Sequence, residues 1–429
     1  MPSLPTTPNL AEATDPAQSP VEERVKITGA LRRLLVWILP ANLIICIIWG
    51  SVPSVLLPLQ IASIDPVNRV GTLAIITTVG ALIAMIAQPL VGVVSDRTRS
   101  RYGRRARWMI VGALVGGLGM VGVGLANSVV QIGIAYIIVQ IGYNFVQGPV
   151  TAILPDRVPQ SLRGTFSALA GIGVMFGALG GQAVGAALSS NIPVAYLVLA
   201  GALLVVMVLF VVFNPDRSSL ERVVPRFQFG DFLRSFWVNP VAHPDFFWAF
   251  VGRLFLYTGY FSVVGYQLYI LQDYIGLGDS AVAALPLFGL VGLVGILIAT
   301  GISGPLSDRI GRRKVFVFGS SIVIGVAMLI PLFAPTFTGW LIFQAVVGLG
   351  FGMFQAVDQA LITEVLPSSD HYGKDLGVVN IAATLPQTFA PAVGGAVVLL
   401  FHGYGALFPV GAVLAVLGAV AVWLIKSVR

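Results

Sequence analysis

The chain has 429 residues, of which 57% are hydrophobic and 10% are charged, and its formal net charge is +7. The mean hydropathy is +0.91, which excludes a soluble globular protein of ordinary composition. The apolar residues form long continuous runs rather than short alternating ones, which argues against a transmembrane β-barrel. The composition predicts an all-α membrane protein.

Twelve apolar windows follow one another along the chain, each long enough for a helix of about 20 residues to cross the hydrocarbon core. They cover 34–58, 70–94, 108–125, 129–154, 165–188, 194–213, 246–271, 282–303, 315–333, 340–365, 376–400 and 404–425. Residues 1–30 are polar and rich in proline, which predicts a disordered cytoplasmic tail. The hydrophilic stretch 214–244 is predicted to link an N-terminal six-helix bundle, 31–213, to a C-terminal one, 245–429.

The basic residues indicate how the windows are oriented. Of the 25 lysines and arginines, Arg69 falls in an outer turn, Arg253 falls inside a window, and the rest fall in termini and loops on one side. This positive-inside pattern predicts a multi-pass protein of the plasma membrane with both termini in the cytoplasm. It argues against a nucleic-acid partner, because the arginines flank membrane segments, where they contact lipid headgroups.

One motif closes the second window and occurs again at the end of the eighth. Each copy places a carboxylate at the end of the apolar run, followed by a glycine and a cluster of arginines. The copies comprise Gly92, Asp96, Arg97, Gly103, Arg104 and Arg105, and then Gly304, Asp308, Arg309, Gly311, Arg312 and Arg313. The two halves align at a near-constant offset, with four extra residues in the first loop, which is the layout of parallel-repeat secondary transporters.

The pattern Gly-x-x-x-Asp-Arg-x-Gly-Arg-Arg resembles the signature of the major facilitator superfamily (MFS). Residues 304–313 match it almost letter for letter, and residues 92–105 match it with the insertion. The likeness covers about residues 32–429. It implies twelve helices in two pseudo-symmetric bundles that expose a central site to each side of the membrane in turn.

The resemblance also implies a gating latch at the inner surface. Asp96 and Asp308 are expected to pair with arginines and a helix N-terminus when the cavity faces outward, and to separate when it faces inward. Asp156 and Glu364 close the fourth and tenth windows at matching places. They are the expected partners of Arg104, Arg105, Arg312 and Arg313. The alternative is that these charges serve topology and solvation alone.

A narrower likeness concerns the coupling ion. The inserted loop and the Leu-Pro-Gln sequence at 385–387 resemble the glycoside–cation and sucrose–proton symporter branches. Sodium-coupled members carry acids in their first two helices, where this chain has Asn42 and no carboxylate, so a proton is expected. Members of the drug-antiporter branch have an arginine at the position of Asn144, which makes drug export the less favoured reading.

Arg253 and Asp358 are the ionisable residues that lie well inside apolar windows. Each is eight or nine positions from the inner face, roughly 12–14 Å deep at ~1.5 Å per residue. A charge there costs at least ~2.5 kcal/mol on insertion scales. Three interpretations stay open: Arg253 binds solute while Asp358 takes a proton, the two form a pair whose breakage couples solute to protons, or they form a static pair between the seventh and tenth helices.

Amide and phenol side chains are the other candidates for the central site, because they offer the donors and acceptors that hydroxylated solutes need. They are Asn42, Tyr143, Asn144, Gln147, Tyr257, Tyr260, Gln355 and Gln359. Each serves an interhelical hydrogen bond equally well. The chain has no phosphate-binding loop and no metal-ligand spacing among its three histidines, so no cofactor, metal or enzymatic activity is expected.

These features predict a monomeric secondary active transporter that works by alternating access, coupled to protons. The expected substrate is a small polar solute, with a sugar or glycoside as the candidate class. One alternative is an efflux transporter for drugs or secondary metabolites on the same fold. Another, of a different class, is a non-transporting membrane sensor or scaffold.

Overall fold

The computed structural model describes residues 29–221, 243–365 and 372–426, without the side chains of 359, 363, 364 and 372–383. Most of the predicted tail and of the predicted linker lies outside the described residues. Within these described ranges, eleven helical spans are long and apolar enough to cross a membrane. The remaining predicted window, the eleventh, corresponds to α16 (Tyr372–Leu400), of which residues 384–400 form a shorter apolar helix.

The elements of the first half are α1 (Gly29–Ser51), the π-helical segment η1 (Val52–Leu56), α2 (Leu57–Ile64), α3 (Arg69–Arg97), α4 (Ala106–Gly124), α5 (Val129–Thr151), α6 (Ile153–Arg157), η2 (Gln160–Leu162), α7 (Arg163–Ala187) and α8 (Ile192–Phe213). Those of the second half are α10 (Pro244–Val264), α11 (Gln267–Tyr269), the π-helical segment η3 (Ile270–Tyr274), α12 (Ser280–Ile310), α13 (Arg313–Met328), α14 (Ile330–Phe333), α15 (Phe337–Glu364), α16, η4 (Tyr404–Ala406) and α17 (Leu407–Trp423).

The first and seventh windows differ from the expected single helices. The first continues through η1 and α2 to Ile64, because a π-helical turn accommodates Pro53 without ending the helix. The seventh breaks after Val264 and continues as the short α11 and η3. Each half therefore has a π-helical segment toward the far end of its first membrane helix.

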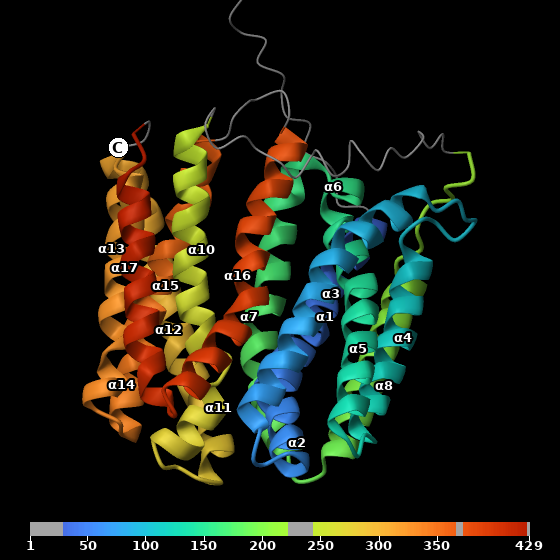
Figure 1. The fold of residues 1–429 in the computed structure, drawn as a ribbon. Helices are drawn as coiled ribbons and strands as arrows, with labels where there is room; N and C mark the ends of the chain where they lie inside the picture. Colours follow the sequence, from blue (N-terminus) through green and yellow to red (C-terminus); the bar gives the residue numbers. More distant parts are fainter. Residues whose placement is uncertain (1–28, 222–242, 366–371, 427–429) are drawn as a thin grey trace, which may run out of the picture.

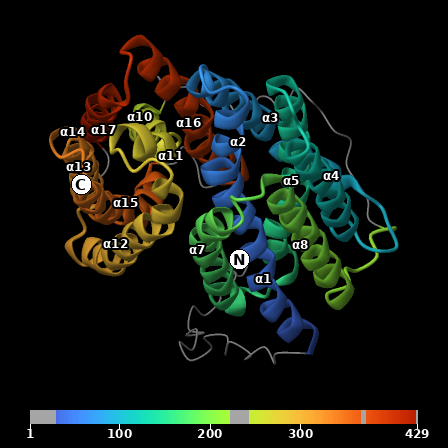
Figure 2. The same ribbon diagram turned by 90° about the horizontal axis from the view of Figure 1, so that it is seen from below.

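The same helix pairs pack in both halves. In the first bundle α1 packs against α7, α4 against α5 and α8, and α3 against α5; in the second, α10 packs against α16, α13 against α15 and α17, and α12 against α15. The bundles meet along two helix pairs, α3 with α16 and α7 with α12. Figure 1 shows the bundles side by side, and Figure 2 shows both pairs end-on. The expected two-bundle architecture is confirmed.

Glycines allow the closest of these helix contacts. Gly173, Gly177 and Gly181 form one edge of α7, which lies against α1. A Cβ added to Gly177 would lie 2.6 Å from both the Leu43 carbonyl oxygen and the Cys46 Cβ. Since lipid supplies no hydrophobic drive between helices, such backbone contacts contribute much of the attraction.

The two ends of the helix array differ. The arginine-rich end holds residues 96–107 and 308–314, together with the C-terminus at the top of Figure 1, and the other end is called the opposite end. Close contacts between the bundles lie toward the opposite end: a Cβ on Gly395 of α16 would lie 2.6 Å from the Ala74 Cβ of α3, and Gln182 of α7 abuts Gly289 of α12. By contrast, a Cβ on Gly92 or Gly304 would meet nothing within 4 Å. The bundles are therefore in contact at the opposite end.

Replacing Gly177 by valine is expected to lower the thermal stability of the purified protein, because the new side chain must force α1 and α7 apart. Overpacking of this kind costs about 1–3 kcal/mol. Gly171→Val is the matched control, since Gly171 lies on the same helix and has open space at its Cβ position. The measurement is a fluorescence melt in detergent. Equal melting temperatures for the two variants would contradict the close contact.

Candidate functional site

The two deeply placed charges form a buried ion pair. Arg253 of α10 donates from Nε to the Asp358 Oδ2 of α15 at 2.8 Å, and its Nη2 contacts the same oxygen. Each side chain is 5% exposed. Removing one member of such a pair leaves an uncompensated buried charge, which is far more costly than removing both. Of the three interpretations from the sequence, two require that Arg253 and Asp358 form a pair: one that breaks during transport and one that is static. Both agree with this geometry.

An aromatic cluster lies beside this pair. Tyr257 is four residues beyond Arg253, so the two share one face of α10. Its ring packs against Phe351 and Phe354 of α15, with centroids 5.8 and 5.5 Å apart. Tyr260 stacks on Phe351 at 4.5 Å and 18°. The structure thus brings four predicted site residues together on α10 and α15: the ion pair and both tyrosines.

The candidates of the first bundle bond within that bundle. The Asn42 amide donates to the Ile38 carbonyl on its own helix at 2.9 Å. The Tyr143 hydroxyl of α5 donates to the Ile45 carbonyl of α1 at 3.2 Å, and the Asn144 amide donates to the Gln140 carbonyl at 2.8 Å. Gln147 is half-buried and Gln355 is exposed, whereas the side chain of Gln359 lies outside the description.

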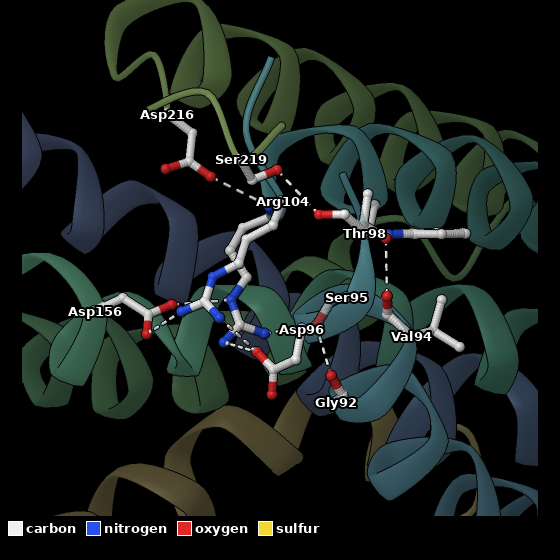
Figure 3. Close-up of polar contacts among 11 residues, drawn as sticks. Gly92, Val94, Ser95, Asp96, Thr98, Arg104, Asp156, Asp216 and Ser219 are labelled. Carbon is white, nitrogen blue, oxygen red and sulfur yellow. Dashed lines mark hydrogen bonds and ion pairs between the residues drawn. The ribbon is translucent and has the colours of Figure 1, made fainter. Parts of the chain in front are cut away.

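The first copy of the repeated motif forms a cluster of two arginines and two carboxylates (Figure 3). Arg104 contacts Asp96 at 3.0 Å and Asp156 at 2.5 Å. Arg105 contacts Asp96 at 2.6 Å and Asp156 at 3.0 Å, and it donates to the Ser95 hydroxyl at 2.5 Å. Asp96 ends α3, Asp156 lies in α6, and the arginines immediately precede α4. All partners belong to one bundle, so motion between the bundles need not break these bonds.

The inserted loop of the first copy is attached to the segment that follows α8. Gly103 has φ +84°, in the left-handed region that glycine adopts without strain. Because it has no side chain, the carboxylate of Asp216 fits against it. Asp216 accepts from the Arg105 backbone N–H at 3.2 Å. Ser100 and Ser219 exchange two bonds of 3.0 Å, one from the Ser100 N–H to the Ser219 hydroxyl and one from the Ser219 N–H to the Ser100 carbonyl. The sequence analysis did not identify Asp216 or Ser219.

The second copy is more open. Gly311, at φ +66°, ends α12 in the left-handed conformation, and its N–H donates to the Ser307 carbonyl. Arg313 pairs with Asp308 at 3.2 Å, and the Asp308 side chain is 69% exposed. Arg309 and Arg312 are exposed, and the Glu364 side chain lies outside the description. Among the described side chains, the two copies therefore share the ion pair between the motif aspartate and the last arginine, and the carboxylate of this pair is more exposed in the second copy.

At the opposite end, Arg69 of α3 pairs with Asp273 of η3. This ion pair joins the two bundles, and the sequence analysis did not predict it. The available signal was that Arg69 is the one basic residue in a turn predicted to be on the outer side.

Within the described ranges, no group of three or more His, Cys, Asp or Glu side chains is placed to hold a metal ion.

Two six-helix bundles with matching helix pairs, a motif repeated at the arginine-rich end and a buried ion pair define a membrane protein of the MFS type. The family described as MFS/sugar transport protein matches residues 68–427. The chain belongs to this family. A crystal structure of a variant of the nucleoside transporter NupG superposes with a TM-score of 0.71, covering 91% of this chain and 98% of that one at 14% identity.

Shorter stretches resemble curated transporters. The chain is 30% identical over 109 residues to the inner membrane metabolite transport protein YgcS of Escherichia coli K12, covering 25% of this chain and 24% of that protein. It is 35% identical over 78 residues to the niacin transporter NiaP of Acinetobacter baylyi, covering 18% of each, and 32% identical over 128 residues to a D-xylose transporter of Levilactobacillus brevis, covering 29% and 26%. These matches span less than a third of each relative.

Arg105→Gln is expected to destabilise the first bundle, because it removes charge-assisted bonds to Asp96, Asp156 and Ser95. Hydrogen bonds to charged groups contribute about 1.5–3 kcal/mol each when buried, and part of that is lost here because Asp96 is half exposed to solvent. Arg107→Gln is the matched control, since Arg107 is an exposed arginine two residues along α4. A thermal melt should show a clear decrease for the first variant and little change for the second. The reverse order would show that the cluster does not stabilise this bundle.

Proposed function

We propose that this protein is a secondary active transporter of a small polar solute, coupled to protons and working by alternating access as a monomer. In this proposal it lies in the plasma membrane with its arginine-rich end and both termini in the cytoplasm. The relatives are named as transporters of metabolites, niacin, D-xylose and nucleosides. A sugar, a glycoside or another hydroxylated compound is the solute class that this comparison and the amide and phenol side chains support.

The observation that carries the proposal is the Arg253–Asp358 pair beside the aromatic cluster of Tyr257, Tyr260 and Phe351. A permanent pair between two helices is an expensive way to hold them together, since apolar side chains of similar volume often do so equally well. A pair that opens has another use. Protonation of Asp358 removes its charge and frees the Arg253 guanidinium to donate to solute oxygens, while the neighbouring rings offer a flat apolar surface to a sugar or heterocycle.

The first copy of the motif suggests how the arginine-rich end closes. Its ion pairs hold α3, α4 and α6 as one unit, so they are suited to move together rather than to open. Gly92 and Gly304, which have open space at their Cβ positions in this conformation, are proposed to meet the other bundle when the solute site turns outward. We propose that the latch residues Asp96 and Asp308 then contact the end of the facing helix, as the sequence predicted.

The first test of the proposal identifies the solute. Purified protein is melted between pH 5 and pH 8 with D-xylose, nicotinate, nucleosides and glycosides, and a solute that binds the folded state raises the melting temperature by mass action. Stabilisation should depend on pH. Absence of stabilisation by any hydroxylated solute, combined with stabilisation by lipophilic drugs, would favour an exporter instead.

The second test separates transport from folding. Arg253→Gln and Asp358→Asn each leave one buried charge and should lower the melting temperature, whereas the double variant should recover much of the stability. Uptake of the stabilising solute into proteoliposomes should be lost in all three variants. The rise in external pH that accompanies proton-coupled uptake should be lost as well. Proton-coupled uptake in the double variant at the rate of the unmodified protein would remove the pair from the mechanism.

A further inference from the structure

A second ion pair joins the two bundles at the opposite end. Arg69 is the first residue of α3, and its Nη2 donates to the Asp273 Oδ2 of η3 at 2.6 Å. The partners lie 204 positions apart in the sequence. Their side chains are 28% and 32% exposed, so this pair is in contact with solvent, unlike the pair in the centre of the second bundle.

Two tyrosines extend this contact to further elements. The Tyr404 hydroxyl of η4 donates to the same Asp273 oxygen at 2.8 Å. The Arg69 guanidinium lies over the Tyr269 ring, 5.0 Å from its centroid. The Tyr269 hydroxyl in turn donates to the Pro58 carbonyl of α2 at 2.8 Å. The network therefore ties the ends of α2 and α3 in one bundle to α11, η3 and η4 in the other.

The local structure leaves Arg69 available to reach across. The nearest carboxylate in its own turn is Asp65, which accepts from the Thr72 hydroxyl at 2.8 Å and from the Asn68 backbone and amide at 3.2 and 3.1 Å. These bonds, the Thr72 bond above all, lower the pKa of Asp65. Because Asp65 is engaged within its turn, the guanidinium of Arg69 is directed to the other bundle.

We propose that Arg69, Asp273 and Tyr404 form the gate of the opposite end: their contacts hold this end closed and break when the central site opens there. The bundles also touch where Ala74 meets Gly395 and where Gln182 meets Gly289. A partly exposed ion pair suits a reversible contact, because water and salt replace each partner when it opens. The inference holds for any solute and any coupling ion, so it does not depend on the proposed substrate.

The test measures the separation of the bundles at this end. Cys46, the single cysteine, is replaced by serine, and spin labels are attached at Ser190→Cys and Thr338→Cys, two exposed positions at this end of different bundles. The distance distribution is recorded by pulsed electron spin resonance in nanodiscs. The unmodified gate should give mainly the short distance. Arg69→Gln and Asp273→Asn should each increase the population with the longer distance by about threefold, which corresponds to ~0.65 kcal/mol, and Tyr404→Phe should increase it less.

Controls distinguish a gate from a general loss of stability. Asp279→Asn removes an acid from an exposed turn six residues beyond Asp273 and should leave the distribution unchanged. The exchanged pair, Arg69→Asp with Asp273→Arg, should restore the short distance in part. Raising NaCl from 0.05 to about 1 M should favour the long distance in the unmodified protein but not in Asp273→Asn. Unchanged distributions in both single variants, or an exchange with no recovery, would overturn the proposal.

Discussion

The free-energy cost of a charge surrounded by apolar helices determines what each ion pair of this protein can do. Arg253 and Asp358 are almost fully buried, so neither tolerates the loss of its partner unless a proton or a solute takes that partner's place. Arg69 and Asp273 lie at a solvent-exposed edge and separate at little cost, since exposed pairs contribute about 0–1 kcal/mol. The position of each pair along the helices thus indicates whether separation requires a ligand or only thermal motion.

The halves share a fold but have different contacts. In the first half, the inserted loop is bound to Asp216 and Ser219, and the cluster of Arg104 and Arg105 joins three helices. In the second, the described side chains of the corresponding loop include the Arg313–Asp308 pair, whose carboxylate is largely exposed, and the buried Arg253–Asp358 pair joins α10 and α15. This arrangement stabilises the first bundle at the arginine-rich end and places the deeply buried ion pair in the second bundle. At the positions where the halves align, Asn42 in the first stands against Arg253 in the second, which is one source of the asymmetry.

The sequence predicted the twelve windows and the two-bundle fold because continuous apolar runs leave few alternatives in a membrane. It also singled out Arg253 and Asp358, since a charge inside such a run demands a partner. It could not predict that Arg69 meets Asp273, because an exposed charge in a turn gives no information about its partner 204 positions away. The π-helical segment Val52–Leu56 was missed because a π-helical turn leaves the hydrophobic pattern intact. The break after Val264 was missed because the apolar run continues through it.

The α10–η3 segment connects the central pair to the gate. Arg253 lies on α10, and Tyr269 and Asp273 follow after the break at Val264, so one continuous stretch carries charges from both networks. Tyr266 at this break donates to the Pro391 carbonyl of α16 at 2.7 Å and packs against Gly394, and α16 in turn contacts α3, the helix of Arg69. A shift of α10 on release of Arg253 would therefore reach the gate along the chain itself and across α16. Coupling between the sites requires an element with two arrangements, and the break between Val264 and Gln267 is the candidate for that element.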